Sequence, residues 1–142
     1  MTKVFLDANI LIDIFDNSRP SHNDSSKLFT YLLDNISDYE LFTSCDLLTT
    51  IYYVLNRKLD NDIILDKIEI LNNLISVIEF GNQDIKEAIK LMRDDKNFKD
   101  LEDTIQFITA KKENCDYIIS NDKGFYSDKI KLISSKNAFD II

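Results

Sequence analysis

The chain contains very few of the residues that interrupt regular structure or mark special chemistry. Its 142 residues include two glycines, one proline, two cysteines and one histidine. So little glycine and proline leaves no obvious linker, and the sequence shows no repeat or low-complexity tract. Cys45 and Cys115 lack the spacing of zinc or redox sites and are predicted to be reduced core residues. His22 has no nucleophile motif near it and is predicted to lie at the surface.

Long apolar runs and an excess of positive charge are also missing. The apolar runs are only a few residues long, far below the roughly 20 needed to cross a bilayer, so we expect a soluble cytoplasmic protein without a membrane partner. Seventeen Lys and Arg against 25 Asp and Glu give a net charge of −8. This charge argues against a basic nucleic-acid platform, because phosphate contacts supply most nonspecific affinity. An acidic protein can still bind phosphates where divalent cations sit on its carboxylates.

The pattern of apolar residues predicts a single α/β domain over residues 1–142. A hydrophobic content of 44% is enough to bury a core at this length. Strand-like and helix-like segments alternate, which predicts a mainly parallel sheet covered on both faces. The expected strands are Val4–Leu6, Glu40–Thr43, Val77–Glu79, Tyr117–Ser120 and Lys131–Ile133. The expected helices are Asn9–Phe15, Asp24–Ile36, Asp46–Leu59, Asp62–Ile75, Gln83–Met92, Leu101–Glu113 and Ser135–Phe139.

Asp7 is the most informative position, because it ends the first predicted strand immediately before a helix. The carboxyl edge of an α/β sheet is where such folds bind ligands, so an acid placed there is poised to hold a metal ion. Two further acidic clusters follow far downstream, at residues 100–103 and at Asp122. Carboxylates suit hard ions, which points to Mg²⁺ or Mn²⁺.

Three segments together carry a resemblance to a known family. VFLDANILID at residues 4–13, DLEDTIQFITAKKENCDYIIS at residues 100–120 and the following NDKGF are similar, in order and spacing, to motif regions of PIN-domain proteins. That group includes VapC-type toxins. The resemblance implies a three-layer α/β/α sandwich with a mainly parallel sheet of five strands. It also implies a Mg²⁺- or Mn²⁺-dependent ribonuclease that hydrolyses RNA phosphodiesters and acts as the toxin of a toxin–antitoxin pair.

The resemblance assigns roles to individual residues. Asp7, Asp103 and Asp122 match three acids of the family and are expected to be the catalytic metal ligands. Ser120 stands where the family favours a hydroxyl. The remaining family acid falls on Thr50, which is neutral, so metal affinity should be lower than in the family pattern.

Asp46 and Asn9 are candidates for the surroundings of the metal ion. Asp46 shares an ideal helix face with Thr50 but lies one turn away, about 6 Å along the axis. Asp46 therefore either reaches the metal through a water molecule or caps the N-terminus of its helix. Asn9 follows Asp7 by two residues and either orients that carboxylate or only begins the helix.

The later acids also have structural explanations. Asp100 is closer to Asp103 around an ideal helix than Glu102 is, which makes Asp100 the better secondary candidate. Alternatively, the acids at residues 100–103 only satisfy the dipole at the start of a helix. Asp122 lies in a segment that is also typical of an ordinary turn after a strand.

The resemblance extends to partners, and one substitution keeps a second function class open. Arg57 and Lys58, at the end of the first predicted helix of the pair, are candidate RNA phosphate contacts, the alternative being a solvated charge cap. A toxin would have an antitoxin covering its active-site groove, and self-association into a homodimer is also implied. Thr50 favours the alternative of a catalytically weakened PIN-like module that binds RNA or protein.

Overall fold

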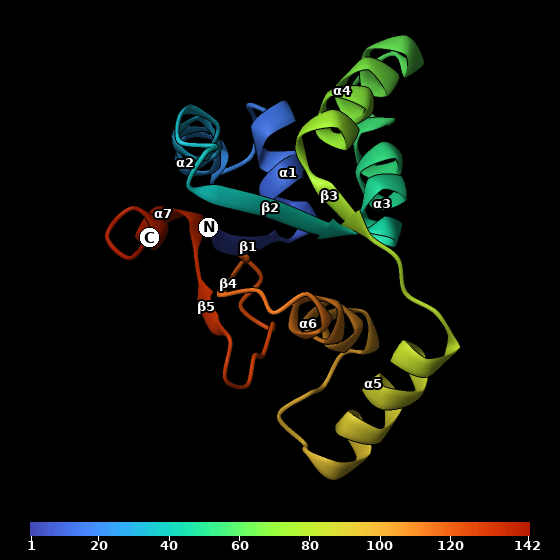
Figure 1. The fold of residues 1–142 in the computed structure, drawn as a ribbon. Helices are drawn as coiled ribbons and strands as arrows, with labels where there is room; N and C mark the ends of the chain where they lie inside the picture. Colours follow the sequence, from blue (N-terminus) through green and yellow to red (C-terminus); the bar gives the residue numbers. More distant parts are fainter.

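The computed structural model describes residues 1–142 and consists of five strands and seven helices (Figure 1). The strands are β1 (Thr2–Leu6), β2 (Tyr39–Ser44), β3 (Ser76–Ile78), β4 (Tyr117–Ile119) and β5 (Lys131–Ile133). The helices are α1 (Ala8–Phe15), α2 (His22–Asp34), α3 (Cys45–Leu55), α4 (Asn61–Leu74), α5 (Asn82–Asp94), α6 (Leu101–Lys112) and α7 (Ser135–Ala138).

The five strands form one parallel sheet in the order β3-β2-β1-β4-β5. Val4, Phe5 and Leu6 of β1 have no solvent exposure, as expected for a central strand that is covered on both faces. The chain builds the sheet outward from β1 to β3 and then returns to the other side of β1 with β4. The strand order therefore reverses between β1 and β4, which is the switch point where open α/β sheets bind ligands.

The helices pack on both faces of the sheet and produce a three-layer α/β/α arrangement (Figure 1). In Figure 1, α1 to α4 lie on one side of the strands, and α6 lies on the other side with α5 outside it. Fully buried side chains such as Ile10, Leu11, Leu28 and Leu32 belong to a continuous core of 31 residues. The predicted fold class is confirmed.

The boundaries of the elements agree with the sequence prediction to within a few residues. The largest difference is α3, which ends at Leu55 rather than Leu59 because the chain turns there, with Lys58 N–H donating to the Leu55 carbonyl. Cys115 is buried and Cys45 is half-buried, and both are free thiols as predicted. None of the seven helices has the length and apolar composition of a helix that spans a bilayer.

Candidate active site

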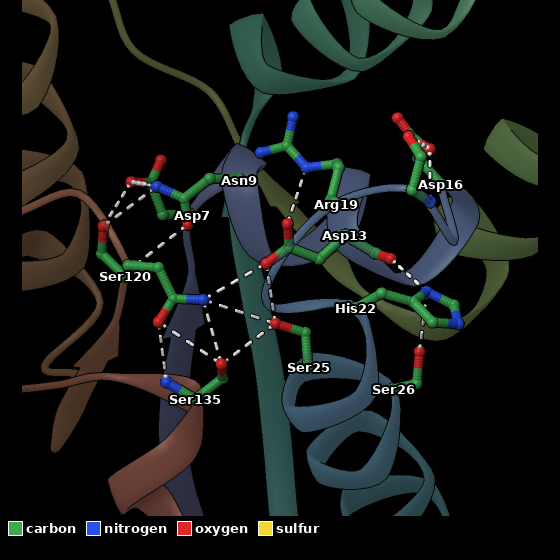
Figure 2. A network of polar contacts seen from close by, with 12 residues as sticks. Asp7, Asn9, Asp13, Asp16, Arg19, His22, Ser25, Ser26, Ser120 and Ser135 are labelled. Atoms are coloured by element: carbon green, nitrogen blue, oxygen red, sulfur yellow. Dashed lines mark hydrogen bonds and ion pairs between the residues drawn. The ribbon is translucent and has the colours of Figure 1, made fainter. Parts of the chain in front are cut away.

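Asp7 lies directly at the switch point, between the ends of β1 and β4. Its backbone N–H donates to the Ile119 carbonyl at 3.0 Å, which fixes the two strand ends together. Asp7 is only 7% exposed, and its carboxylate accepts hydrogen bonds from Ala8 N–H at 2.7 Å and from Ser120 Oγ at 2.7 Å. Asp7 is thus both the N-cap of α1 and a buried acid held in one orientation (Figure 2).

Burial raises the pKa of Asp7 above its usual range, even though the hydrogen bonds from Ser120 and Ala8 favour its ionised form. Repulsion from Asp122 and Asp46 raises the pKa of Asp7 further. Acids from two distant parts of the chain therefore lie within electrostatic reach of the end of β1.

Asp103 lies in the first turn of α6 and is half-buried. Burial, and then repulsion from Asp122, Asp100, Asp7 and Glu102, raises the pKa of Asp103 to about 7. The fold therefore brings all three acids that were predicted as metal ligands into one electrostatically coupled group.

Asp122 follows β4 and is exposed. Its Oδ1 accepts the Gly124 N–H at 2.8 Å, and its own N–H donates to Ser120 Oγ at 3.1 Å. The ordinary turn considered from the sequence is therefore present. The same turn leaves the Asp122 carboxylate close enough to raise the pKa of both Asp7 and Asp103.

Asp46, the second residue of α3, accepts hydrogen bonds from two side chains. Gln106 Nε2 of α6 donates to both carboxylate oxygens, at 3.3 and 3.2 Å, and Ser44 Oγ donates to Oδ1. No backbone N–H of α3 donates to the Asp46 carboxylate, and the N-cap of α3 is Ser44. Asp46 raises the pKa of Asp7 and of Glu102, so its charge acts on these acids, and it also lies in the first turn of α3, where the helix dipole favours an acid.

Gln106 is a residue that the sequence reasoning did not select. It is 1% exposed, and its Oε1 has no hydrogen-bond partner. Thr50, the position of the missing family acid, donates through Oγ1 to the Asp46 carbonyl at 3.2 Å. The Thr50 hydroxyl is therefore used inside α3, while Asp46 supplies a carboxylate one turn earlier.

The structure removes the geometric reason for ranking Asp100 above Glu102 as a secondary candidate. Asp100 is the N-cap of α6 with extended backbone angles, φ −123° and ψ 129°, and its Oδ1 accepts the Asp103 N–H at 2.9 Å. The ideal-helix angle used for Asp100 does not apply, because Asp100 stands outside the helix. Burial raises the pKa of Glu102, and repulsion from Asp46 is the next largest cause. Glu102 thus belongs to the same group, which we call the acid cluster; its members are Asp7, Asp46, Asp100, Glu102, Asp103 and Asp122.

Asn9 contacts the carboxylate of Asp7, which is the arrangement that the first of its two predicted roles requires. Its Nδ2 donates to Asp7 Oδ2 at 3.1 Å and to Ser120 Oγ at 3.3 Å, and its Oδ1 accepts the Asn121 N–H at 3.1 Å (Figure 2). The amide therefore connects Asp7 with the segment after β4.

A second polar network continues from this point around Asp13, which is 3% exposed. Asp13 accepts hydrogen bonds from Arg19 Nε at 2.7 Å, Ser25 Oγ at 2.8 Å and Asn121 Nδ2 at 3.2 Å. His22 was predicted to lie at the surface, but it is half-buried, with Nδ1 2.6 Å from the Asp13 carbonyl (Figure 2). This network fixes the C-terminal part of α1 against α2.

Lys58 and Arg57, the candidate RNA contacts, differ in their surroundings. Lys58 Nζ donates to Asp16 Oδ2 at 2.9 Å and to Ser18 Oγ at 2.6 Å. The hydrogen bond from Ser18, followed by the one from Lys58, lowers the pKa of Asp16 to about 2. Arg57 is exposed, and no hydrogen bond joins Arg57 or Lys58 to the acid cluster.

Comparison with known proteins decides the family. The PIN domain family model matches residues 4–129. The chain belongs to the PIN-domain family. This PIN domain is 47% identical over 134 residues to Ribonuclease VapC1 of Aquifex aeolicus (strain VF5), an alignment that covers 94% of the chain and 91% of the relative.

Solved structures show the same fold at low sequence identity. VapBC2 from Rickettsia felis, bound to a DNA fragment from its promoter, matches with a TM-score of 0.70 at 16% identity, covering 94% of this chain and 98% of that one. VapC20 of Mycobacterium tuberculosis, a toxin that cleaves the sarcin-ricin loop, matches with a TM-score of 0.66 at 16% identity, covering 81% and 86%. These neighbours confirm the PIN fold.

The donors of this PIN domain fit a hard divalent cation. They are carboxylates that raise one another's pKa, and a bound cation would remove that repulsion. No three Asp, Glu, His or Cys side chains meet in a geometry that encloses an ion in this structure. Direct ligation of one ion by three acids would therefore require their carboxylates to come closer together.

Proposed function

We propose that this protein is a divalent-metal-dependent ribonuclease in which Asp7, Asp103 and Asp122 are the catalytic metal ligands and Mg²⁺ or Mn²⁺ is the ion. The supporting observation is the acid cluster at the switch point of the sheet, where burial and like charges raise the pKa of Asp103 to about 7. The ribonuclease class is supported by 47% identity with a curated ribonuclease over nearly the whole chain.

Each acid has a distinct task in this proposal. Asp7 is held by Ser120 and Ala8, so its free lone pairs keep one direction when substrate arrives. Asp103 and Asp122 lie on α6 and on the segment after β4, so with Asp7 they would hold a divalent ion from different elements, and that ion would contact the scissile phosphate. A bound divalent ion would lower the pKa of a water molecule and stabilise the charge that develops on the phosphodiester.

Asp46 supplies the fourth negative charge in place of Thr50. Gln106 and Ser44 donate to its carboxylate and hold it toward the cluster. Since Asp46 lies about one helical turn, roughly 6 Å, from position 50, we propose that it acts on the ion through a bound water. Asn9, Ser120 and Asp100 orient Asp7 and the start of α6 around the same site.

The partners of this protein follow from its relatives. The 47% identical relative carries the name VapC1, and a solved neighbour is a toxin–antitoxin complex from Klebsiella pneumoniae. We therefore propose that the chain is a toxin, that an antitoxin covers the groove over the acid cluster, and that the chain self-associates as a homodimer. Co-expression with the product of a neighbouring small reading frame, followed by size-exclusion chromatography, tests both associations.

Cleavage of single-stranded and structured RNA with Mn²⁺ tests the catalytic proposal. Asp7→Asn and Asp103→Asn should each lower kcat/KM at least 100-fold. Asp94→Asn is the matched control, because Asp94 is an exposed acid on α5, paired with Lys90, and should leave cleavage unchanged. The weakened-module alternative predicts RNA or protein binding by the unchanged chain without cleavage. Activity that survives Asp7→Asn would refute the proposed site.

A further inference from the structure

A groove lined by three lysines adjoins the acid cluster on the side of Asp122. It runs between the segment after β4, the edge strand β5 and the start of α7, and its basic side chains are Lys123, Lys131 and Lys136. Ser120, Asn121 and Asp122 line the same groove, so one end of the groove lies at the carboxyl edge of the sheet, next to the acid cluster. In Figure 1, β5 lies beside β4 at one border of the sheet, and α7 follows β5 on the side of α2.

The three lysines are not neutralised by the protein. All are exposed, and the five ion pairs of the structure involve other cations. Asp24 and Asp122 line the same groove, so three lysines against two carboxylates leave it with a formal charge of +1 in a chain whose net charge is −8. Lys131 also discourages pairing of another strand with the edge strand β5, but this explanation does not extend to Lys123 or Lys136, which lie outside strands.

Hydrogen bonds fix the walls of the groove to the catalytic edge. Asn121 Oδ1 accepts the Ser135 N–H at 3.0 Å, and Asn121 Nδ2 donates to Ser135 Oγ at 2.9 Å. The Ser120 N–H donates to the Ile133 carbonyl at 3.1 Å. Lys131 begins β5 and Ser134 follows it, so the basic groove continues for about 10 Å along the strand.

We propose that this groove binds the RNA strand next to the scissile phosphate, with Lys123, Lys131 and Lys136 contacting backbone phosphates. The proposal rests on the ribonuclease function. If the scissile phosphate lies at the acid cluster, the RNA strand on one side of that phosphate continues into the adjoining groove. Eleven of the fifteen lining residues are polar or charged and four are apolar, which favours a nucleic-acid backbone over an apolar protein segment. An acidic segment of a protein partner is the competing occupant that the experiment separates.

Salt-dependent binding of a fluorescein-labelled 12-nucleotide single-stranded RNA tests the groove. Measurements use fluorescence anisotropy from 50 to 200 mM KCl in an Asp7→Asn background, which prevents cleavage. Each lost phosphate contact lowers the slope of log K against log salt by about 0.7 for single strands, so a Lys123→Gln/Lys131→Gln/Lys136→Gln variant should lose about 2 from this slope. We expect its affinity at 50 mM KCl to fall at least tenfold.

A matched variant separates local contacts from net charge. Lys86→Gln/Arg93→Gln/Lys96→Gln removes the same charge from exposed residues on or just after α5, none of which lines the groove. Its slope should remain that of the Asp7→Asn protein. An unchanged slope in the groove variant, or RNA binding without any salt dependence in the Asp7→Asn protein, would overturn the groove proposal.

Two further outcomes distinguish the groove from the active site. If cleavage depends on Asp7 but the groove variant keeps its RNA slope and loses a co-expressed antitoxin, the ribonuclease stands and the groove is a protein site. If cleavage survives Asp7→Asn, the proposed active site fails, and the slope comparison still decides whether RNA follows the lysines. Melting temperatures equal to that of the unchanged chain confirm that the lysine variants fold.

Discussion

Asp46→Asn gives the sharpest test of how this PIN domain compensates for Thr50. The substitution keeps the shape of the side chain and an oxygen that accepts from Gln106 or Ser44, but it removes the charge that raises the pKa of Asp7 and Glu102. Two effects of opposite sign are expected. Metal affinity should fall, and the metal-free protein should become slightly more stable because a repulsive charge is gone.

The magnitude follows from the position of Asp46 beside the ligands rather than among them. Residues that orient or support metal ligands typically contribute about 10- to 100-fold in metal affinity, or about 1.4–2.7 kcal/mol. The gain in stability without metal should be smaller, about 0.5–1 kcal/mol, because solvent screens the charges around a partly open site. One such change corresponds to a rise of roughly 2–4 °C in Tm.

Calorimetric titration with Mn²⁺ and thermal unfolding in EDTA measure the two effects separately. Asp62→Asn is the matched control, since Asp62 is the second residue of α4 just as Asp46 is the second residue of α3, and it is exposed. Loss of Asp62 should slightly lower stability through the helix dipole and leave Mn²⁺ affinity unchanged.

A helix-capping role for Asp46 predicts the reverse of these results. If Asp46→Asn binds Mn²⁺ as tightly as the unchanged chain and loses stability as Asp62→Asn does, the compensation for Thr50 is refuted. A second variant, Asp46→Asn/Thr50→Glu, restores the charge one turn along α3. It should recover at least part of the lost affinity, and no recovery would show that total charge is not the controlling quantity.

Three further results are expected. Gln106→Leu should weaken Mn²⁺ binding about tenfold in calorimetry, because Asp46 loses its hydrogen-bond donor on α6. The fold should be retained, because the substitution also removes the unpaired Oε1. Full Mn²⁺ affinity would contradict a positioning role for Gln106. Ser120→Ala removes a hydrogen bond that lowers the pKa of Asp7, so the acidic limb of the pH profile of kcat/KM should move to higher pH, and an unmoved limb would count against Asp7 as the ionising group. The folded-state pKa of Asp103 is raised to about 7, so its contribution to stability is complete below pH 4 and is lost as pH rises through 7. In EDTA, Tm should fall by roughly 3–8 °C between pH 4.5 and 8; Asp103→Asn should reduce this fall, and the raised pKa values of Asp7 and Glu102 should maintain the remainder.

The sequence by itself determined the approximate elements and selected three acids, whose role as metal ligands stays a prediction. Alternation of apolar residues is a local property, so strands and helices could be placed to within a few residues. Asp7 could be placed at the sheet edge because a carboxylate ending a buried strand has only that location. Asp103 and Asp122 came from the order and spacing of family motifs, and the fold brings both near Asp7.

Only the tertiary structure decided how the surrounding side chains are used. Asp46 contacts Gln106, which lies 60 residues away on a different helix, and no local pattern encodes this pairing. The relation of Asp100 to Glu102 depended on which residue leaves the helical conformation at the N-cap, which an ideal helix does not specify. Side-chain direction is set by long-range packing and by backbone angles at helix ends, whereas hydrophobic periodicity reports only which face is buried.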